Sequence, residues 1–382
     1  MTWPEDFWWG TGASSTQCEG AAPASDWARW EGLGRAPASG EGNGFGNRYA
    51  EDFALLADHG LTHHRLSIEW ARIEPRQGER DNDAVEHYRS VLLAARSAGI
   101  EPWVCLHHFT LPGWFGDDLG GFRDARATGY WWPRHVDFCA ETFGDLVHGW
   151  KPINEPVAYA VAGFLAGQFP PGRRDVDDFH IVVRNIHRAN RDAARLLRGA
   201  GSPVATIHNL SPVHAADPSP EARSRAARVD DVIWNSWAEP ELLEPFDLIG
   251  FSYYSALAVG PDGTFGVYPA DAEAGPMGYA PWSAGLGEVL HRLAEDHPDR
   301  PLLIDECGIG TEDDEWRATY LHDCLAEVER AIGDGIDLRG FFHWTAVDNY
   351  EWLHGYDVAF GLFDRDRNVR DSIEVLESAI RT

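Results

Sequence analysis

Short apolar runs alternate with longer amphipathic segments along most of the chain. This alternation predicts strand–helix units, which build parallel sheets. The strand candidates are Phe7–Gly12, Thr62–Ser67, Glu101–His107, Gly149–Asn154, Val204–His208, Leu248–Tyr254, Leu302–Glu306 and Gly340–Trp344. Eight such strands with helices between them predict an α/β fold of the (β/α)₈ or TIM-barrel type rather than an open sheet.

The segments between the strand candidates carry helical periodicity and end at glycines. Arg48–His59 places apolar side chains on one face, and Gly60 follows it as a candidate helix C-cap. Further helices are predicted at Asn82–Ala98, Ile181–Arg198 and Trp316–Ile332. Because no Gly-, Ser- or Pro-rich linker divides the chain, residues 1–382 are predicted to form a single domain.

Three longer segments exceed what a minimal barrel needs: Ser25–Asn47, Phe109–Arg134 and Leu257–Trp282. Each follows a strand candidate, and barrel active sites are built from the loops that follow strands. We therefore expect long loops to form the active-site face. The tryptophans of Phe109–Arg134 favour a functional role for that segment.

Composition narrows the range of partners. The 32 Lys and Arg residues against 61 Asp and Glu residues give a formal net charge of −29. Such a surface repels phosphate backbones, so nucleic acid is not an expected partner. The 17 Trp residues exceed what core filling alone requires, and indole rings are good platforms for the faces of sugars.

The cysteines and the hydropathy pattern bear on location. Five cysteines are scattered without CxxC spacing: Cys18, Cys105, Cys139, Cys307 and Cys324. An odd, dispersed set argues against a disulfide framework or a zinc knuckle. The sequence begins without a signal-like stretch, and no apolar run reaches the length of a membrane span. We expect a cytoplasmic protein with no membrane partner, no cofactor and no metal; the oligomeric state stays open.

Two carboxylates occupy matching positions at predicted strand ends. Glu155 follows the fourth strand candidate and precedes Pro156, and Glu306 closes the seventh. Catalytic groups of barrels lie at the C-terminal ends of strands. Two opposed carboxyl groups are the minimum equipment for hydrolysing a glycosidic bond.

A series of motifs then makes the chain resemble glycoside hydrolase family 1, the β-glucosidase family, nearly from end to end. The motifs in chain order are Phe7-Trp8-Trp9-Gly10, Gln17-Cys18-Glu19-Gly20, Arg65-Leu66-Ser67-Ile68-Glu69-Trp70, Leu106-His107-His108-Phe109, Asn154-Glu155-Pro156, Glu306-Cys307-Gly308 and Asp348-Asn349-Tyr350-Glu351-Trp352. The resemblance implies a retaining β-glycosidase that acts on a small-molecule β-glycoside through a covalent glycosyl-enzyme. The sugar would be gluco-configured, with galacto- and fuco-configured sugars as alternatives.

The resemblance also implies a role for each site residue. Glu306 would be the nucleophile, supported by Arg65 and Tyr254, and Glu155 would be the acid/base. The other residues implied to bind the sugar are Gln17, His108, Asn154, Trp344, Glu351 and Trp352. A carboxylate at Glu351 would repel a 6-phosphate, which argues against the phospho-glycosidase branch of the family. Retention requires carboxyl groups about 5–5.5 Å apart.

The chain departs from the family pattern at four positions. Cys307 and Ser252 stand where the family has Asn, Thr110 stands where it has Asp, and Ala359 replaces an Arg. Alternation along the sixth strand would put Ser252 on the same face as Tyr254. The loss of two amides near the nucleophile would alter the rate or the donor preference.

Three alternatives remain open from the sequence. A transglycosidase would use the same residues, with an acceptor site supplied by the Trp-rich Phe109–Arg134. A metal-dependent barrel hydrolase would use some of the 17 His, although each of the pairs His63-His64 and His107-His108 offers at most one inward ligand. A non-catalytic sugar-binding protein would be expected to lack one carboxylate, and both are present.

Overall fold

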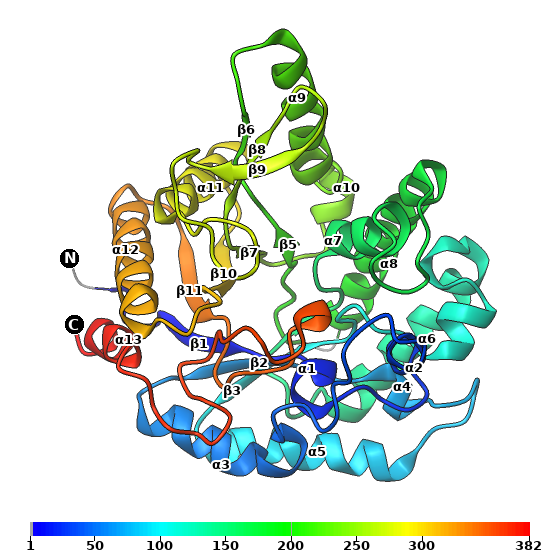
Figure 1. Cartoon of the computed structure of the whole chain (residues 1–382). Helices are drawn as coiled ribbons and strands as arrows, with labels where there is room; N and C mark the ends of the chain where they lie inside the picture. Colours follow the sequence, from blue (N-terminus) through cyan, green and yellow to red (C-terminus); the bar gives the residue numbers. More distant parts are fainter. Residues whose placement is uncertain (1–2, 200) are drawn as a thin grey trace.

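The computed structural model describes residues 3–199 and 201–382. Its central sheet has eight parallel strands in the order β4-β3-β2-β1-β11-β10-β7-β5 (Figure 1). They are β1 (Trp8–Gly12), β2 (His63–Ser67), β3 (Glu101–Cys105), β4 (Gly149–Lys151), β5 (His208–Asn209), β7 (Ile249–Tyr253), β10 (Leu302–Cys307) and β11 (Leu338–His343). A parallel bridge between Trp150 and Val204 joins β4 to the segment that leads into β5. The sheet is therefore closed, and the TIM-barrel prediction is confirmed.

Strands β4 and β5 are shortened the most relative to the prediction, for local chemical reasons. Strand β4 ends at Lys151 because Pro152 has no N–H to donate to a ladder. The predicted strand Val204–His208 is interrupted at Thr206. Its side-chain hydroxyl donates to the carbonyl of Gly250 and accepts from the N–H of the same residue, at 3.0 Å in each case, so it replaces the regular backbone pairing there.

Helices surround the barrel (Figure 1). They are α1 (Ser15–Glu19), α2 (Asp26–Gly32), α3 (Phe45–Asp58), α4 (Trp70–Ile73), α5 (Asn82–Ser97), α6 (Ala125–Phe143), α7 (Pro156–Ala160), α8 (Val176–Arg198), α9 (Pro220–Asn235), α10 (Pro240–Leu243), α11 (Ser283–Asp296), α12 (Asp314–Gly333) and α13 (Ile373–Ile380). Single turns of other helix types lie at η1 (Trp114–Asp118), η2 (Gly121–Arg123), η3 (Val161–Leu165) and η4 (Trp352–His354). The four predicted helices correspond to α3, α5, α8 and α12, and Gly60 after α3 takes the left-handed conformation with φ 81°.

The three long segments differ in structure. Ser25–Asn47 contains α2 and the start of α3. Leu257–Trp282 contributes to a hairpin of β8 (Ala256–Val259) and β9 (Phe265–Tyr268), which joins β6 (Val213–Ala215) in a second, three-stranded sheet beside α9 (Figure 1). The expectation of one loop over Phe109–Arg134 is wrong in its second half. Helix α6 begins there because Asp124 caps it, accepting from the N–H groups of two following residues.

One end of the barrel interior is filled by large apolar side chains. Trp103, Leu303 and Phe342 pack together there, and none is measurably exposed. Gly149 makes room for Trp103, since a Cβ at that position would lie 2.4 Å from the indole ring. Because apolar side chains fill this end, the polar groups that could act chemically are expected at the C-terminal ends of the strands.

Among the described residues, no helix combines the length and apolarity needed to cross a membrane.

Candidate active site

The two candidate catalytic carboxylates both lie inside the mouth of the barrel. Glu306, on β10, places one oxygen against the guanidinium of Arg65 and accepts a hydrogen bond of 2.5 Å from the hydroxyl of Tyr254. Its exposed fraction is only 3%. A cation and a hydroxyl donor both stabilise the ionised form of a carboxyl group. The structure thus brings Glu306 together with both residues expected to support it.

Glu155 lies four residues beyond Lys151, the last residue of β4, and immediately precedes α7, with a left-handed backbone at φ 42°. For a residue with a Cβ this conformation is strained and is held by its surroundings; the Glu155 N–H donates to the carbonyl of Ile207 at 3.1 Å. Its carboxylate accepts from the side-chain amide of Asn209 at 3.3 Å. Burial raises the pKa of Glu155, and the nearby Ser252 and Asn209 side chains offset this only in part. Burial is thus the leading cause of the raised pKa of Glu155, and the charge of Glu306 is not among the causes.

Arg65 connects the nucleophile to the sugar-binding side of the site. The guanidinium is fully buried, donates to Nδ1 of His108 at 3.0 Å, and lies over the ring of Trp344 with 5.1 Å to its centroid. Since Nδ1 of His108 accepts, the proton of the neutral ring lies on Nε2. Burial and the charge of Arg65 hold the pKa of His108 well below its usual value, so the ring is a neutral donor.

Polar groups suited to sugar hydroxyls lie on the same side. The amide nitrogen of Gln17 donates to Glu351 at 3.0 Å, and the amide oxygen of Gln17 accepts from Ser14 at 2.8 Å. Burial and the charge of Glu155 raise the pKa of Glu351 to about 8. Both amide atoms of Asn154 are buried and have no hydrogen-bond partner among the described residues. A buried amide without partners is costly, and a ligand hydroxyl would satisfy it.

Aromatic rings complete the sugar-binding side. The ring of His108 is nearly parallel to those of Trp344 and Trp352, at 10° and 9°, with centroids 5.9 and 6.1 Å away. The rings of Trp27 and Trp352 pack edge to face, with their centroids 4.7 Å apart. Flat rings at fixed angles are the surfaces on which the apolar faces of sugars stack.

Sequence reasoning missed two features of the site. Asn209 ends β5 next to Glu155, and the rule that located Glu155, a polar residue at a strand end, would also have found it. Asp305 lies fully buried in the barrel and contacts Lys151 and Arg65. The pairing of β10 with β7 shifts register between Ile304 and Glu306. This irregularity allows adjacent carboxylates to face inward, whereas regular alternation would turn one of them away.

The departures from the family pattern have different consequences. Ser252 is fully buried and acts on the pKa of Glu155, as expected for a residue facing the site. The expectation that Cys307 removes a group near the nucleophile is wrong, because its Sγ lies 3.8 Å from that of Cys324 on α12, outside the barrel interior. Thr110 donates to Glu69 at 2.8 Å. Arg317 of α12 donates to the carbonyl of Ala359, the position without the family's Arg.

The tryptophans of Phe109–Arg134 do not form an acceptor site. Trp114 donates to the backbone carbonyl of Glu74 at 2.8 Å, and Trp132 donates to that of Ala189 at 3.1 Å. Trp132 is fully buried on α6. These contacts place the indoles in the packing between helices and loops, so the observation that favoured a transglycosidase is lost.

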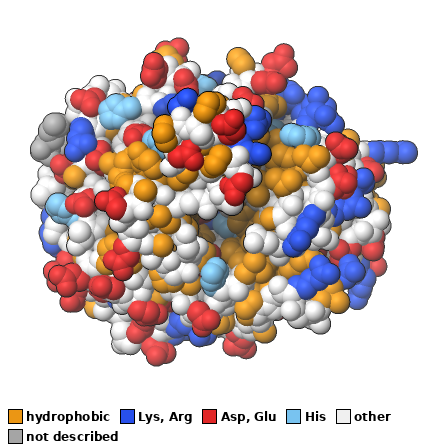
Figure 2. Space-filling view, turned by 45° about the horizontal axis from the view of Figure 1, so that its top comes forward, with side chains coloured by type: hydrophobic (Ala, Val, Ile, Leu, Met, Phe, Trp, Pro, Cys, Tyr) orange, Lys and Arg blue, Asp and Glu red, His pale blue; other side chains and the backbone are white. Residues whose placement is uncertain are grey.

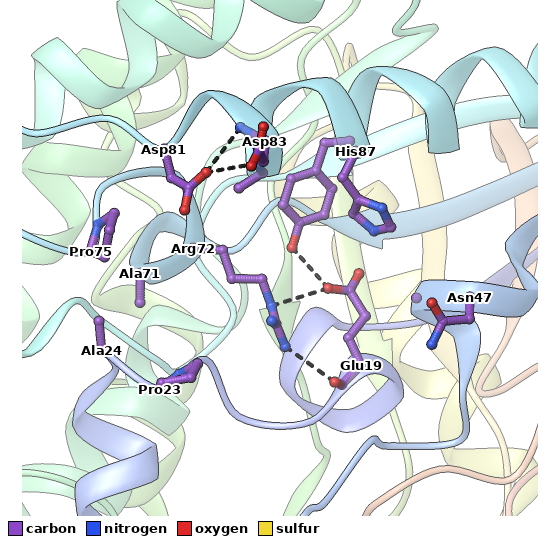
Figure 3. Close-up of a pocket in the computed structure, with 13 residues that line it drawn as sticks. Glu19, Pro23, Ala24, Asn47, Ala71, Arg72, Pro75, Asp81, Asp83 and His87 are labelled. Carbon is purple, nitrogen blue, oxygen red and sulfur yellow. Dashed lines mark hydrogen bonds and ion pairs between the residues drawn. The ribbon is translucent and has the colours of Figure 1, made fainter.

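A separate cavity of about 500 Å³ lies on the flank of the barrel, against α4 and α5 (Figure 3). Its buried carboxylate, Glu19, accepts from Tyr88 at 2.9 Å and lies 3.4 Å from Arg72. Burial raises the pKa of Glu19 to about 7. Because this carboxylate is already partnered by Arg72 and Tyr88, the arrangement is that of an internal ion pair.

Comparison with known proteins agrees with this geometry. The model of glycosyl hydrolase family 1 matches residues 1–245 and 244–380. Beta-glucosidase A of Thermotoga maritima is 28% identical over 97% of this chain and 94% of its own length. The 6-phospho-beta-glucosidase GmuD of Bacillus subtilis is 26% identical over 97% of this chain and 95% of its own length.

The solved structure of a beta-glycosidase from Pyrococcus horikoshii superposes with a TM-score of 0.91 and 30% identity, covering 100% of this chain and 95% of that one. None of these similarities supports a metal-dependent or non-catalytic barrel. With the family model matching nearly the whole chain, the protein belongs to glycosyl hydrolase family 1 and is a glycoside hydrolase.

Proposed function

We propose that this glycoside hydrolase cleaves β-glucosides with retention of configuration, with Glu306 as nucleophile and Glu155 as acid/base. The observation that carries the proposal is the contrast between the two carboxyl groups. Glu306 contacts the cation of Arg65 and the hydroxyl of Tyr254, while burial raises the pKa of Glu155. Environments that push two carboxyl groups toward opposite protonation states define an acid and a nucleophile.

In the first step, the Glu306 carboxylate attacks the anomeric carbon as the bond to the leaving oxygen breaks. Glu155 gives its proton to that oxygen, and an ester links the sugar to Glu306. Esterification removes the negative charge of Glu306, so we expect the pKa of Glu155 to fall. In the second step, Glu155 takes a proton from water, the water oxygen bonds to the anomeric carbon, and Glu306 leaves as a carboxylate.

The sugar would be held by groups that can donate and accept. The free Nε2–H of His108, the amide of Asn154, and the pair Gln17 and Glu351 supply both kinds of contact. Asn154 would bond the 2-hydroxyl, a contact that strengthens in the transition state. A gluco-configured sugar is favoured by the names of the relatives, most of which are beta-glucosidases. Galacto- and fuco-configured sugars differ from it at one or two hydroxyls, so substrates with these sugars should be assayed for comparison.

A 6-phosphorylated sugar is not the proposed substrate. A phosphate needs a cation beside it. The pKa of Glu351 is shifted by burial, by the charge of Glu155 and by a hydrogen bond from Gln17, and no Lys or Arg is among these causes. Arg65 is engaged by Glu306 and Asp305. A rate with 4-nitrophenyl 6-phospho-β-glucoside above that with the unphosphorylated glucoside would contradict this.

A 2-deoxy-2-fluoro-β-glucoside with a dinitrophenolate leaving group tests the proposal directly. The fluorine slows the second step, so the glycosyl-enzyme accumulates and peptide mapping should find the label on Glu306. The sugar released from an ordinary substrate should appear first as the β-anomer, observed by proton NMR. A label on another residue would overturn the nucleophile assignment. An α-anomeric first product would indicate inversion, which needs carboxyl groups about 6.5–9.5 Å apart.

We further propose that residues 1–382 work as one domain in a reducing, cytoplasmic environment. All five cysteines are buried and free, which supports a location where disulfides do not form. The partner proposed is the small-molecule glycoside.

A further inference from the structure

A cavity of about 560 Å³ opens beside the catalytic carboxylates, below the three-stranded sheet and α9. This volume is in the range of sites that enclose a small ligand. Two residues join it to the chemistry. Asn209 and Tyr254 line the cavity, and they bond Glu155 and Glu306 respectively. The cavity therefore begins at the bond to be cleaved.

The cavity is not formed by the groups expected to hold the sugar. None of Gln17, His108, Glu351 and Trp352 lines it. A group in this cavity would be the part of the substrate that leaves, the aglycone. Figure 2 shows a hollow near the centre of one face of the molecule, with hydrophobic side chains gathered around it.

The walls are chemically unlike a site for a second sugar. Away from the strand ends they are formed by Val161, Leu165, Val232, Ile233, Leu257 and Phe265. A second sugar would need donors and acceptors for several hydroxyls, and leaving those hydroxyls unbonded against apolar walls is costly. An extended apolar aglycone gains free energy from the same walls.

Two arginines on α9 also line the cavity. Arg225 and Arg228 are one helical turn apart, so they lie on the same face of the helix. Among the described residues, no carboxylate oxygen lies within 4.0 Å of either one, and their hydrogen bonds go to the carbonyl of Pro261 and the hydroxyl of Ser224. The pKa of Asp262 is lowered chiefly by its hydrogen bonds with Thr264 and only in small part by Arg225. Neither guanidinium is therefore neutralised by a carboxylate of the described chain in direct contact.

We propose that this cavity is a subsite for an apolar aglycone that carries an acidic group at its outer end, held by Arg225 and Arg228. The proposal rests on the β-glucosidase activity proposed above and names the class of substrate that the activity serves. It predicts glucosides of amphipathic acids, rather than cellobiose, as the preferred substrates.

The test compares kcat/KM for the full-length enzyme on butyl, octyl and 8-carboxyoctyl β-glucosides and on cellobiose. Each added CH₂ should raise kcat/KM by up to about fourfold, from the free energy of burying a methylene. The terminal carboxylate should add about two- to fivefold in low salt, the range of an exposed ion pair. That gain should vanish in concentrated salt.

Two variants locate the effect. Val232→Asn, on the wall, should lower octyl glucoside turnover about tenfold, while Val369→Asn, at an exposed valine outside the cavity, should leave it unchanged. Replacing both arginines with Gln should abolish the advantage of the carboxylate and spare the octyl rate.

The outcomes separate the two levels of the proposal. No turnover of 4-nitrophenyl β-glucoside would refute the underlying activity. Turnover of that substrate with cellobiose equal to or faster than octyl glucoside would refute the apolar subsite alone. Equal rates for octyl and carboxyoctyl glucosides in low salt would refute the role of Arg225 and Arg228.

Discussion

Replacing Glu155 with Ala should reduce turnover by an amount that depends on the leaving group. The side chain accepts a hydrogen bond from Asn209 and lies near Ser252, and no cation among the described residues lies within 4.0 Å of it, so its removal should change the chemistry more than the fold. General acid catalysis contributes about 10²–10⁴-fold, equivalent to about 3–5 kcal/mol of barrier. That loss should appear in full with phenyl β-glucoside, whose leaving oxygen needs a proton, and largely disappear with 2,4-dinitrophenyl β-glucoside.

The assay is kcat/KM on phenyl, 4-nitrophenyl and 2,4-dinitrophenyl β-glucosides for the wild type, Glu155→Ala and Glu306→Ala. Azide should accelerate Glu155→Ala on the dinitrophenyl substrate and yield the β-glycosyl azide, because an anionic nucleophile needs no general base. Glu306→Ala should lose almost all turnover on all three substrates. Equal losses for Glu155→Ala across the series, with no azide effect, would show that Glu155 is not the acid.

Three further predictions follow from buried carboxyl groups. Because the pKa of Glu155 is raised, wild-type kcat/KM should persist above the ordinary carboxyl pKa of 4.5 and fall as the pH rises through the pKa of Glu155; a flat alkaline limb would contradict this. The pKa of Glu351 rises from its ordinary value of 4.5 to about 8, so the folded state binds this proton more tightly than the unfolded state does. The stability of the fold should therefore fall as the pH rises from 4.5 to 8, by at most about 5 kcal/mol. Thermal denaturation of Glu351→Gln against wild type should show the variant gaining relative stability over that window, and a constant difference would refute the shift. Asp305→Asn should destabilise the fold by about 3–5 kcal/mol in urea, since it leaves Lys151 buried without a counter-charge, and adding Lys151→Met should recover part of the loss.

The proposed catalytic pair could be inferred from the sequence because barrels place chemistry at strand ends. Glu155 and Glu306 each end an apolar run, and this pattern can be recognised without knowledge of the fold. The start of α6 could also have been predicted, because Asp124 is a residue type favoured at helix N-caps and precedes a helical pattern. Asn209 directly follows the predicted strand Val204–His208, so the same rule could have located it as well.

Other features depend on contacts that a sequence does not display. Thr206 interrupts its strand through a bond to Gly250, which is distant in the chain. The direction of Cys307 follows from an irregular pairing of β10 that regular alternation does not anticipate. The cavity proposed for the aglycone is lined by residues of several elements far apart in the sequence, including α7, η3, α9, β8 and β9, so no local pattern predicts it.

The irregular pairing of β10 makes the reactive acid sensitive to strand length. Asp305 and Glu306 both reach the interior because the strand carries more residues than its neighbour at that point. Deleting a single residue upstream would restore regular pairing with the neighbouring strand and turn one of the two acids toward the helices. The sugar would then meet the shorter Asp side chain, or no acid at all. Insertions and deletions are therefore least tolerated in the few residues before Glu306, even though no sugar would touch them.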